Sequence, residues 1–259
     1  MTESEVKFEQ YLSGQNLAWT RLPESTRKQA DYAVKHRGAN CIFEVKEFDG
    51  PETKPTGGYS PLPPIRDRIN RAREKFADYR DCCCGVVLWG SKSIYRTAHQ
   101  SVVFPAAFGE GVYAEPEDSI DAGAEAQSFR FIGKAALTPK QNTTISGIVI
   151  LAKYRLNHVW VDAGRQMVAK RQRGEEIRPG EQFDLCQQIY KEKGLQFSYE
   201  GTIRTIVLEN PYARTPFPSD LFVGSFDQHW RLQSGWFRLA FIGSEIERLK
   251  FDKVPSLFW

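Results

Sequence analysis

A carboxylate and an ammonium group stand two residues apart in the apolar segment 41–48, which reads Cys-Ile-Phe-Glu-Val-Lys-Glu-Phe. Because side chains alternate between the two faces of an extended strand, Glu44 and Lys46 are expected on the same face. Burying charged side chains on an otherwise apolar strand costs free energy, unless they form ion pairs or take part in a functional site. The segment therefore predicts a site in which both charges take part.

A second carboxylate, Asp31, lies among small and apolar residues in the candidate strand 29–35. If the two strands form a hairpin around the turn 36–40, Asp31 lies opposite Glu44 and beside Lys46. Two carboxylates and a lysine at one point suit a hard divalent cation and an activated water molecule.

This order of residues resembles the PD-(D/E)XK nuclease superfamily. Asp31 matches the family's first metal-binding aspartate, and Glu44-Val45-Lys46 matches its (D/E)-X-K triplet, while Ala30 stands where the family often has proline. The resemblance covers roughly the first third of the chain. It implies Mg²⁺ or Mn²⁺ held by Asp31, Glu44 and the carbonyl of Val45, with Lys46 orienting the attacking water.

The segment 2–12 predicts a helix on which Glu5, Phe8, Glu9 and Leu12 share one face. Nucleases of this family commonly place an additional acidic residue on their first helix. The resemblance implies Glu9 as this further catalytic residue, with Glu5 as the alternative.

The segment 65–81 is the clearest predicted helix, because apolar residues recur along it at helical spacing. The apolar stripe consists of Ile65, Ile69, Ala72, Phe76 and Tyr79. Basic residues line both edges of the stripe, with Arg66, Arg73 and Arg80 on one edge and Arg68, Arg71 and Lys75 on the other.

RecB-type nucleases carry Gln-x-x-x-Tyr on the corresponding helix, and Lys75 and Tyr79 have that spacing with lysine in place of glutamine. We therefore predict that Arg68, Arg71, Lys75 and Tyr79 contact nucleic acid, the basic residues through phosphate groups.

The expected elements follow the order helix, strand, two-stranded hairpin, helix and strand, with 17–21 as the first strand and 84–89 as the last. This αβββαβ order predicts an α/β fold with a restriction-endonuclease-like core and a mixed central sheet. We place the core in residues 1–95. Residues 96–259 are expected to extend the same sheet of one domain, with strands in 142–151 and 202–210, a helix over 181–193 and an irregular stretch over 101–128.

Composition narrows the function classes. The five cysteines are odd in number and three are consecutive, which favours reduced thiols over disulfides or a zinc site. Phosphate-binding, dinucleotide-binding and hydrolase-elbow motifs are absent from the sequence. An acidic N-terminus and the lack of a membrane-spanning apolar run predict a cytoplasmic protein. The net charge of +3 confines any nucleic-acid footprint to a local patch.

The sequence thus predicts a metal-dependent nuclease, with DNA as the favoured substrate and with a homodimer or a partner protein left open. The alternative is a catalytically silent nucleic-acid-binding or assembly subunit of the same fold. A third hypothesis, an enzyme that uses Asp227 and His229, lacks any partner motif.

Overall fold

The computed structural model describes residues 1–23, 29–48, 62–90, 100–114, 128–178, 180–194, 197–233 and 236–245. Its helices are α1 (Glu3–Gly14), α2 (Leu62–Lys75), α3 (Gln100–Phe108), α4 (His158–Gln172) and α5 (Glu181–Lys193). Its strands are β1 (Ala18–Arg21), β2 (Tyr32–His36), β3 (Ala39–Glu47), β4 (Cys83–Trp89), β5 (Glu110–Ala114), β6 (Ser128–Ile132), β7 (Gly147–Asn157), β8 (Phe197–Glu209), β9 (Gln228–Gln233) and β10 (Trp236–Ile242). None of these helices has the length and apolar character needed to cross a membrane.

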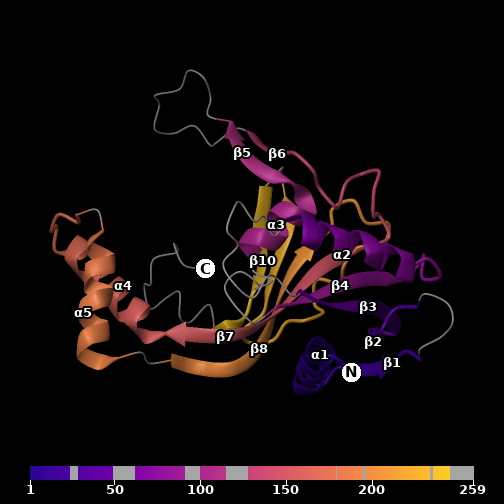
Figure 1. Ribbon diagram of the computed structural model, residues 1–259, viewed down its shortest axis with the longest axis horizontal. Coiled ribbons are helices and arrows are strands. Elements are labelled where there is room, and N and C mark those ends of the chain that lie inside the picture. Colours follow the sequence, from indigo (N-terminus) through magenta and orange to yellow (C-terminus); the bar gives the residue numbers. More distant parts are fainter. Residues whose placement is uncertain are drawn as a thin grey trace.

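An eight-stranded mixed sheet in the order β1-β2-β3-β4-β7-β8-β9-β10 organises the described residues, which confirms the predicted α/β class (Figure 1). The first elements follow the predicted order α1, β1, β2, β3, α2, β4. Strands β3, β4 and β7 are parallel, so their carboxyl ends meet at one edge of the sheet. The strands β7 to β10 of the C-terminal half continue this sheet.

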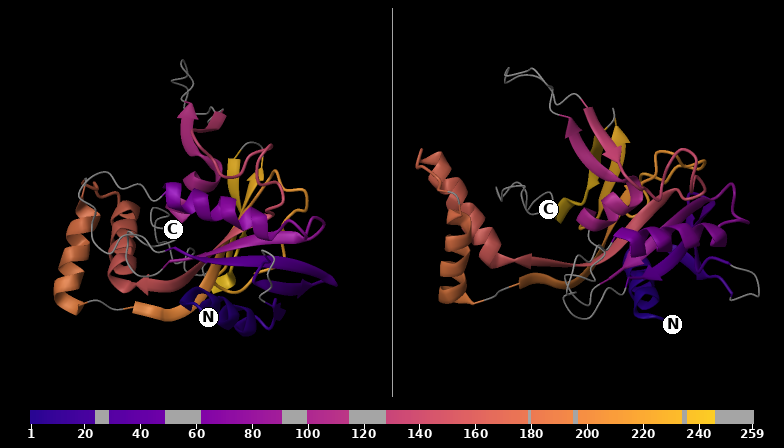
Figure 2. Two further views of the ribbon diagram at one scale, coloured as in Figure 1. Left: turned by 45° about the vertical axis from the view of Figure 1, so that its right-hand side comes forward. Right: turned by 45° about the horizontal axis from the view of Figure 1, so that its top comes forward.

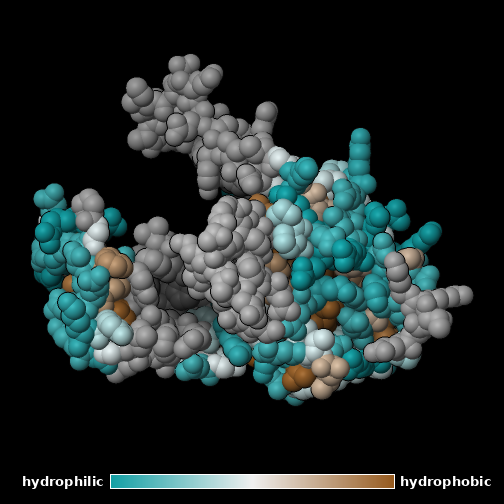
Figure 3. All heavy atoms as spheres, in the orientation of Figure 1, coloured by the Kyte–Doolittle hydropathy of each residue, from teal (hydrophilic) through white to brown (hydrophobic). Residues whose placement is uncertain are grey.

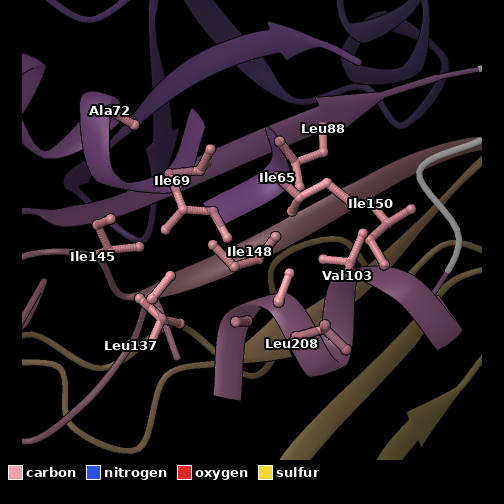
Figure 4. Close-up of a cluster of buried hydrophobic side chains, with 14 of the residues drawn as sticks. Ile65, Ile69, Ala72, Leu88, Val103, Leu137, Ile145, Ile148, Ile150 and Leu208 are labelled. Carbon is pink, nitrogen blue, oxygen red and sulfur yellow. The ribbon is translucent and has the colours of Figure 1, made fainter. Parts of the chain in front are cut away.

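Alternation of side chains along the strands gives the sheet two apolar faces. On the face that we call the α2 face, Ile42 of β3 and Val86 of β4 pack with α2 and α3. On the opposite α1 face, Phe43 and Val45 of β3 pack with Phe8 of α1. Figure 4 shows the α2-face core, where side chains from α2, α3, β4, β7 and β8 converge.

The predicted apolar stripe is present in part: Ile65, Ile69, Ala72 and Phe76 are fully buried, but Phe76 and Tyr79 lie beyond the end of α2. The helix ends at Lys75, however, and not at residue 81 as predicted. Beyond Lys75 the backbone closes tighter turns, in which the Phe76 amide donates to Arg73 O (3.1 Å) and the Tyr79 amide to Phe76 O (3.0 Å).

The prediction of an irregular stretch over 101–128 is wrong where the structure describes it. Val103, Ala106 and Ala107 of α3 are buried in the α2-face core, so apolar packing outweighs the helix-breaking tendency of Pro105. Strand β5 pairs with β6 as a separate antiparallel ribbon, which projects from the body in Figure 1.

Strand β7 extends beyond Leu151, where its pairing with β4 ends, and runs on to Asn157 beside β8. This ribbon carries α4 and α5, which stand apart from the sheet in both views of Figure 2. The two helices pack on each other through Val159, Ala163, Cys186 and Ile189, a small core of their own. Helix α5 has the predicted bounds.

Candidate metal and phosphodiester site

The predicted hairpin is present, and its register fixes the position of Asp31. Tyr32 pairs with Phe43 and His36 with Ala39, so Asp31 follows directly at the open end of the hairpin. The Asp31 amide donates to Phe43 O at 3.0 Å. Ala33, two residues further along β2, packs against the α2-face core, and alternation places the Asp31 side chain on that face too.

The structure brings Asp31, Glu44 and Lys46 together. Asp31 Oδ2 accepts a hydrogen bond from the Val45 amide at 2.8 Å. Lys46 Nζ donates to Glu44 Oε1, so these two side chains form an ion pair on one face of β3. Glu44 pairs with Val86 of the α2-face core, which places the carboxylate on that face.

Glu44 is an unusually placed carboxylate, since only 1% of its surface is exposed. Burial raises its pKa to about 7, and the negative charge of Asp31 adds to this effect, while Lys46 and Lys75 oppose it. Within the described chain, Glu44 Oε2 is buried without a hydrogen-bond partner. A buried carboxylate oxygen in this state is costly, and a cation beside it would remove the cost.

The Val45 carbonyl is suitably placed to join the two carboxylates. The amide and the carbonyl of one strand residue point to the same side, and the Val45 amide points toward Asp31. The structure shows no group of three or more histidine, cysteine or acidic residues that could hold a metal among the residues it describes. Two carboxylates and a carbonyl, completed by water, suit Mg²⁺, which usually keeps several waters.

Glu9 is not brought to this group. Its carboxylate accepts a hydrogen bond from the Tyr32 hydroxyl at 2.8 Å and lies 4.0 Å from Arg21. The Tyr32 side chain belongs to the α1-face core, so the sheet separates Glu9 from Glu44. The alternative, Glu5, accepts from Arg21 at 2.6 Å and caps α1 through Thr2. Both glutamates are engaged on the α1 side of the molecule.

Lys75 reaches the site from α2, although sequence places lysine where the family has glutamine. Its ammonium group donates to Gln29 O at 3.0 Å and is one of the charges that lower the pKa of Glu44. Tyr79 also holds Gln29, since its hydroxyl accepts from Gln29 Nε2 at 2.9 Å. Both therefore hold the segment that leads to Asp31. Sequence reasoning missed Gln29, whose only signal is its position two residues before Asp31.

The other two predicted phosphate contacts differ in their surroundings. Arg68 lies at the carboxyl end of β3, where its Nε donates to Glu47 O at 2.8 Å and its guanidinium group lies 5.4 Å from the Phe48 ring centroid. Arg71 is exposed and pairs with Asp67 on the same helix. Figure 3 shows mainly hydrophilic residues on the surface over α2. The structure thus brings Lys75 near Glu44 and Arg68 to the carboxyl end of β3, whereas Arg71 is exposed to solvent.

Asp227 and His229, the residues of the third hypothesis, are buried in the protein interior. Asp227 accepts hydrogen bonds from the Tyr11 hydroxyl (2.6 Å) and from the amides of Thr205 and Gly224 (2.7 Å each). His229 has no exposed surface. A carboxylate saturated by three donors and an inaccessible imidazole do not form a reaction site.

A scan against protein-family models finds no family that matches this chain, and searches of curated proteins and of solved structures find no match. The assignment of the site therefore depends on its residues and their geometry.

Proposed function

We propose that this protein is a metal-dependent nuclease that hydrolyses phosphodiester bonds, with DNA as its substrate. The observation that carries the proposal is the Glu44 carboxylate, which is buried beside Asp31 with one oxygen lacking a hydrogen-bond partner in the described chain. The preference for DNA comes from the resemblance in sequence.

A structural role does not account for Glu44. Burying a carboxylate is favourable only when its oxygens are satisfied, and a second carboxylate nearby raises the cost. Lys46 satisfies one oxygen of Glu44 and leaves the other. Such strain is typical of sites that bind a charged group, so we infer that a divalent cation completes this one.

Each residue has a role that follows from its position. Asp31, Glu44 and the Val45 carbonyl would hold the cation, which when bound supplies positive charge against the phosphate oxygens. Lys46 keeps 28% of its side chain exposed, so its ammonium group can turn from Glu44 toward the substrate and hold the attacking water by a hydrogen bond. Lys75 adds positive charge from α2.

Cleavage assays with matched variants test this proposal. We would incubate fluorescent single- and double-stranded DNA with Mg²⁺, Mn²⁺ or Ca²⁺ and compare the wild type with Asp31→Asn, Lys46→Ala and Glu9→Gln. Loss of a group that stabilises the transition state lowers rates by about 100-fold or more. We expect that loss in Asp31→Asn and Lys46→Ala. Glu9→Gln should cleave at close to the wild-type rate, because Glu9 lies across the sheet.

The outcomes separate the candidate functions. Equal cleavage by the wild type and both site variants would assign the activity to a contaminant or to another site. DNA binding without cleavage in any of the metals would support the catalytically silent subunit. A loss of cleavage in Glu9→Gln with an unchanged melting temperature would return Glu9 to the site.

A further inference from the structure

A second candidate site lies at the turn end of the β2–β3 hairpin, where a pocket of about 600 Å³ is open to solvent. Its lining includes His36, Arg37, Glu209, Phe217, Asp220 and Arg231. The pocket reaches Ala39 on β3, and Glu44 lies five residues further along that strand, about 17 Å away at the rise of an extended chain. We call this site the hairpin-end pocket, and it is separate from the candidate metal site.

Two guanidinium groups and two carboxylates line the hairpin-end pocket, together with the imidazole of His36. Asp220 is shared by His36, whose Nε2 lies 2.8 Å away, and by Arg37. Glu209 accepts two hydrogen bonds from Arg231, at 2.6 and 3.0 Å. Among the described residues, these contacts use Nε and Nη2 of Arg231 and Nη2 of Arg37. The pocket therefore has spare N–H donors, which match an anionic ligand.

A buried histidine continues this polar group beneath the pocket. His229 has no exposed surface, and its Nε2 donates to the carbonyl of Phe222 at 3.0 Å. Its Nδ1 faces Glu209 Oε1 at 3.7 Å and has no hydrogen-bond partner among the described residues. His229 therefore lies directly behind Glu209, the carboxylate that holds Arg231 in the wall of the pocket.

A tight hairpin turn positions Arg37 at the rim of the pocket. Arg37 has φ +48° and Gly38 φ +83°, the left-handed conformations of a tight two-residue hairpin turn. Asparagine or glycine suits the first of these positions, whereas arginine adopts it at a cost. Phe222, which follows the segment that carries Phe217 and Asp220, is also left-handed, at φ +63°. The turn geometry itself requires the left-handed conformations of Arg37 and Gly38, and it places the Arg37 side chain at the pocket.

We propose that the hairpin-end pocket binds a small molecule that carries a phosphate group. Arg37 on the hairpin turn and Arg231 on β9 donate to the phosphate oxygens from two walls, because planar guanidinium groups match phosphate geometry. Asp220 and Glu209 hold the two guanidinium groups in position. Phe217 provides an apolar surface for the remainder of the ligand. The volume lies in the usual range for small-molecule sites.

Calorimetric titration with inorganic phosphate and with adenosine 5′-monophosphate tests this proposal. The full chain is titrated in EDTA at constant ionic strength, which keeps metal-bridged phosphate away from Glu44. We expect saturable binding at one site, weakened at least tenfold in Arg231→Gln and in Arg37→Asn. Arg71→Gln, an exposed arginine that also pairs with a carboxylate, is the matched control and should bind as the wild type does.

Arg37→Asn keeps the test decisive if Arg231→Gln fails to fold. Asparagine favours the left-handed turn, so this variant should lose phosphate binding without a lower melting temperature. Three results would overturn the proposal: no saturable heat up to about 10 mM of either probe, wild-type affinity in Arg37→Asn, or tighter binding of citrate than of phosphate. Loss of binding in Lys46→Ala, with Arg231→Gln unaffected, would place the phosphate at the candidate metal site instead.

Discussion

Replacement of Glu44 by glutamine should stabilise the metal-free protein at alkaline pH. Burial and the charge of Asp31 raise the pKa of Glu44 from its ordinary 4.5 to about 7. The folded protein therefore binds this proton more tightly than the unfolded chain does. The contribution of protonated Glu44 to the free energy of unfolding is present in full below pH 4.5. This contribution is lost as pH rises toward 7, because the folded state must then carry the buried charge. Glu44→Gln removes this loss.

The magnitude follows from the size of the pKa change. A rise from 4.5 to about 7, at about 1.4 kcal/mol per pH unit, corresponds to about 3 kcal/mol. For a chain of this length, 1 kcal/mol shifts the melting temperature by about 2–4 °C. The quantity to compare is the melting temperature of Glu44→Gln minus that of the wild type, measured in EDTA. We expect this difference to be about 6–12 °C larger at pH 8 than at pH 4.5.

Differential scanning calorimetry at the two pH values provides the assay, with Glu209→Gln as the matched control. Glu209 is also a buried glutamate, but Arg231 and His229 hold its pKa below the ordinary value. Glu209→Gln should therefore destabilise the protein near neutral pH, an effect opposite in sign to that of Glu44→Gln. A Glu44→Gln protein that is less stable than the wild type at pH 8, or equally shifted at both pH values, would refute the reasoning that Glu44 is a strained carboxylate.

Two further predictions concern the basic edge of α2 and the packing of β4. Ca²⁺ should occupy the site without supporting cleavage. In Ca²⁺, Arg68→Ala/Lys75→Ala should weaken DNA binding and reduce the slope of log K against log salt by about two, whereas Arg71→Ala should change neither. A salt series of binding measurements checks this, and an effect of Arg71→Ala alone would reverse the choice of residues. Gly85→Ala should destabilise the protein by about 1–3 kcal/mol, because its Cβ would lie 2.4 Å from the Phe43 ring on β3. Gly14→Ala is the control, since a Cβ at Gly14 meets nothing within 4 Å. Chemical denaturation compares the two variants, and equal stability would contradict the packing.

The juxtaposition of Asp31, Glu44 and Lys46 could be predicted from sequence because strand alternation and a short hairpin are local properties. The turn at Arg37 and Gly38 fixes the register, and the register brings Asp31 opposite the strand of Glu44. The stripe of Ile65, Ile69 and Ala72 could be predicted for the same reason, since helical spacing determines it. The tighter turns after Lys75 could not be predicted from that spacing.

The surroundings of Glu9 could not be predicted in this way. Helical spacing places Glu5 and Glu9 on one face of α1, but the partners of that face come from Arg21 and Tyr32 on separate strands. Only the tertiary arrangement shows that Glu9 lies across the sheet from Glu44. The hairpin-end pocket could not be predicted from the sequence either, because it joins residues more than a hundred positions apart in the chain.

Anomalous diffraction from crystals soaked in Mn²⁺ tests the central claim most directly. We expect one anomalous peak between the carboxylates of Asp31 and Glu44, with oxygen ligands at about 2.0–2.6 Å that include the Val45 carbonyl. The peak should disappear in crystals of Asp31→Asn soaked in the same way. Saturating Mn²⁺ with no peak beside Glu44, or a peak that persists in Asp31→Asn, would contradict the assignment of this site as a metal centre.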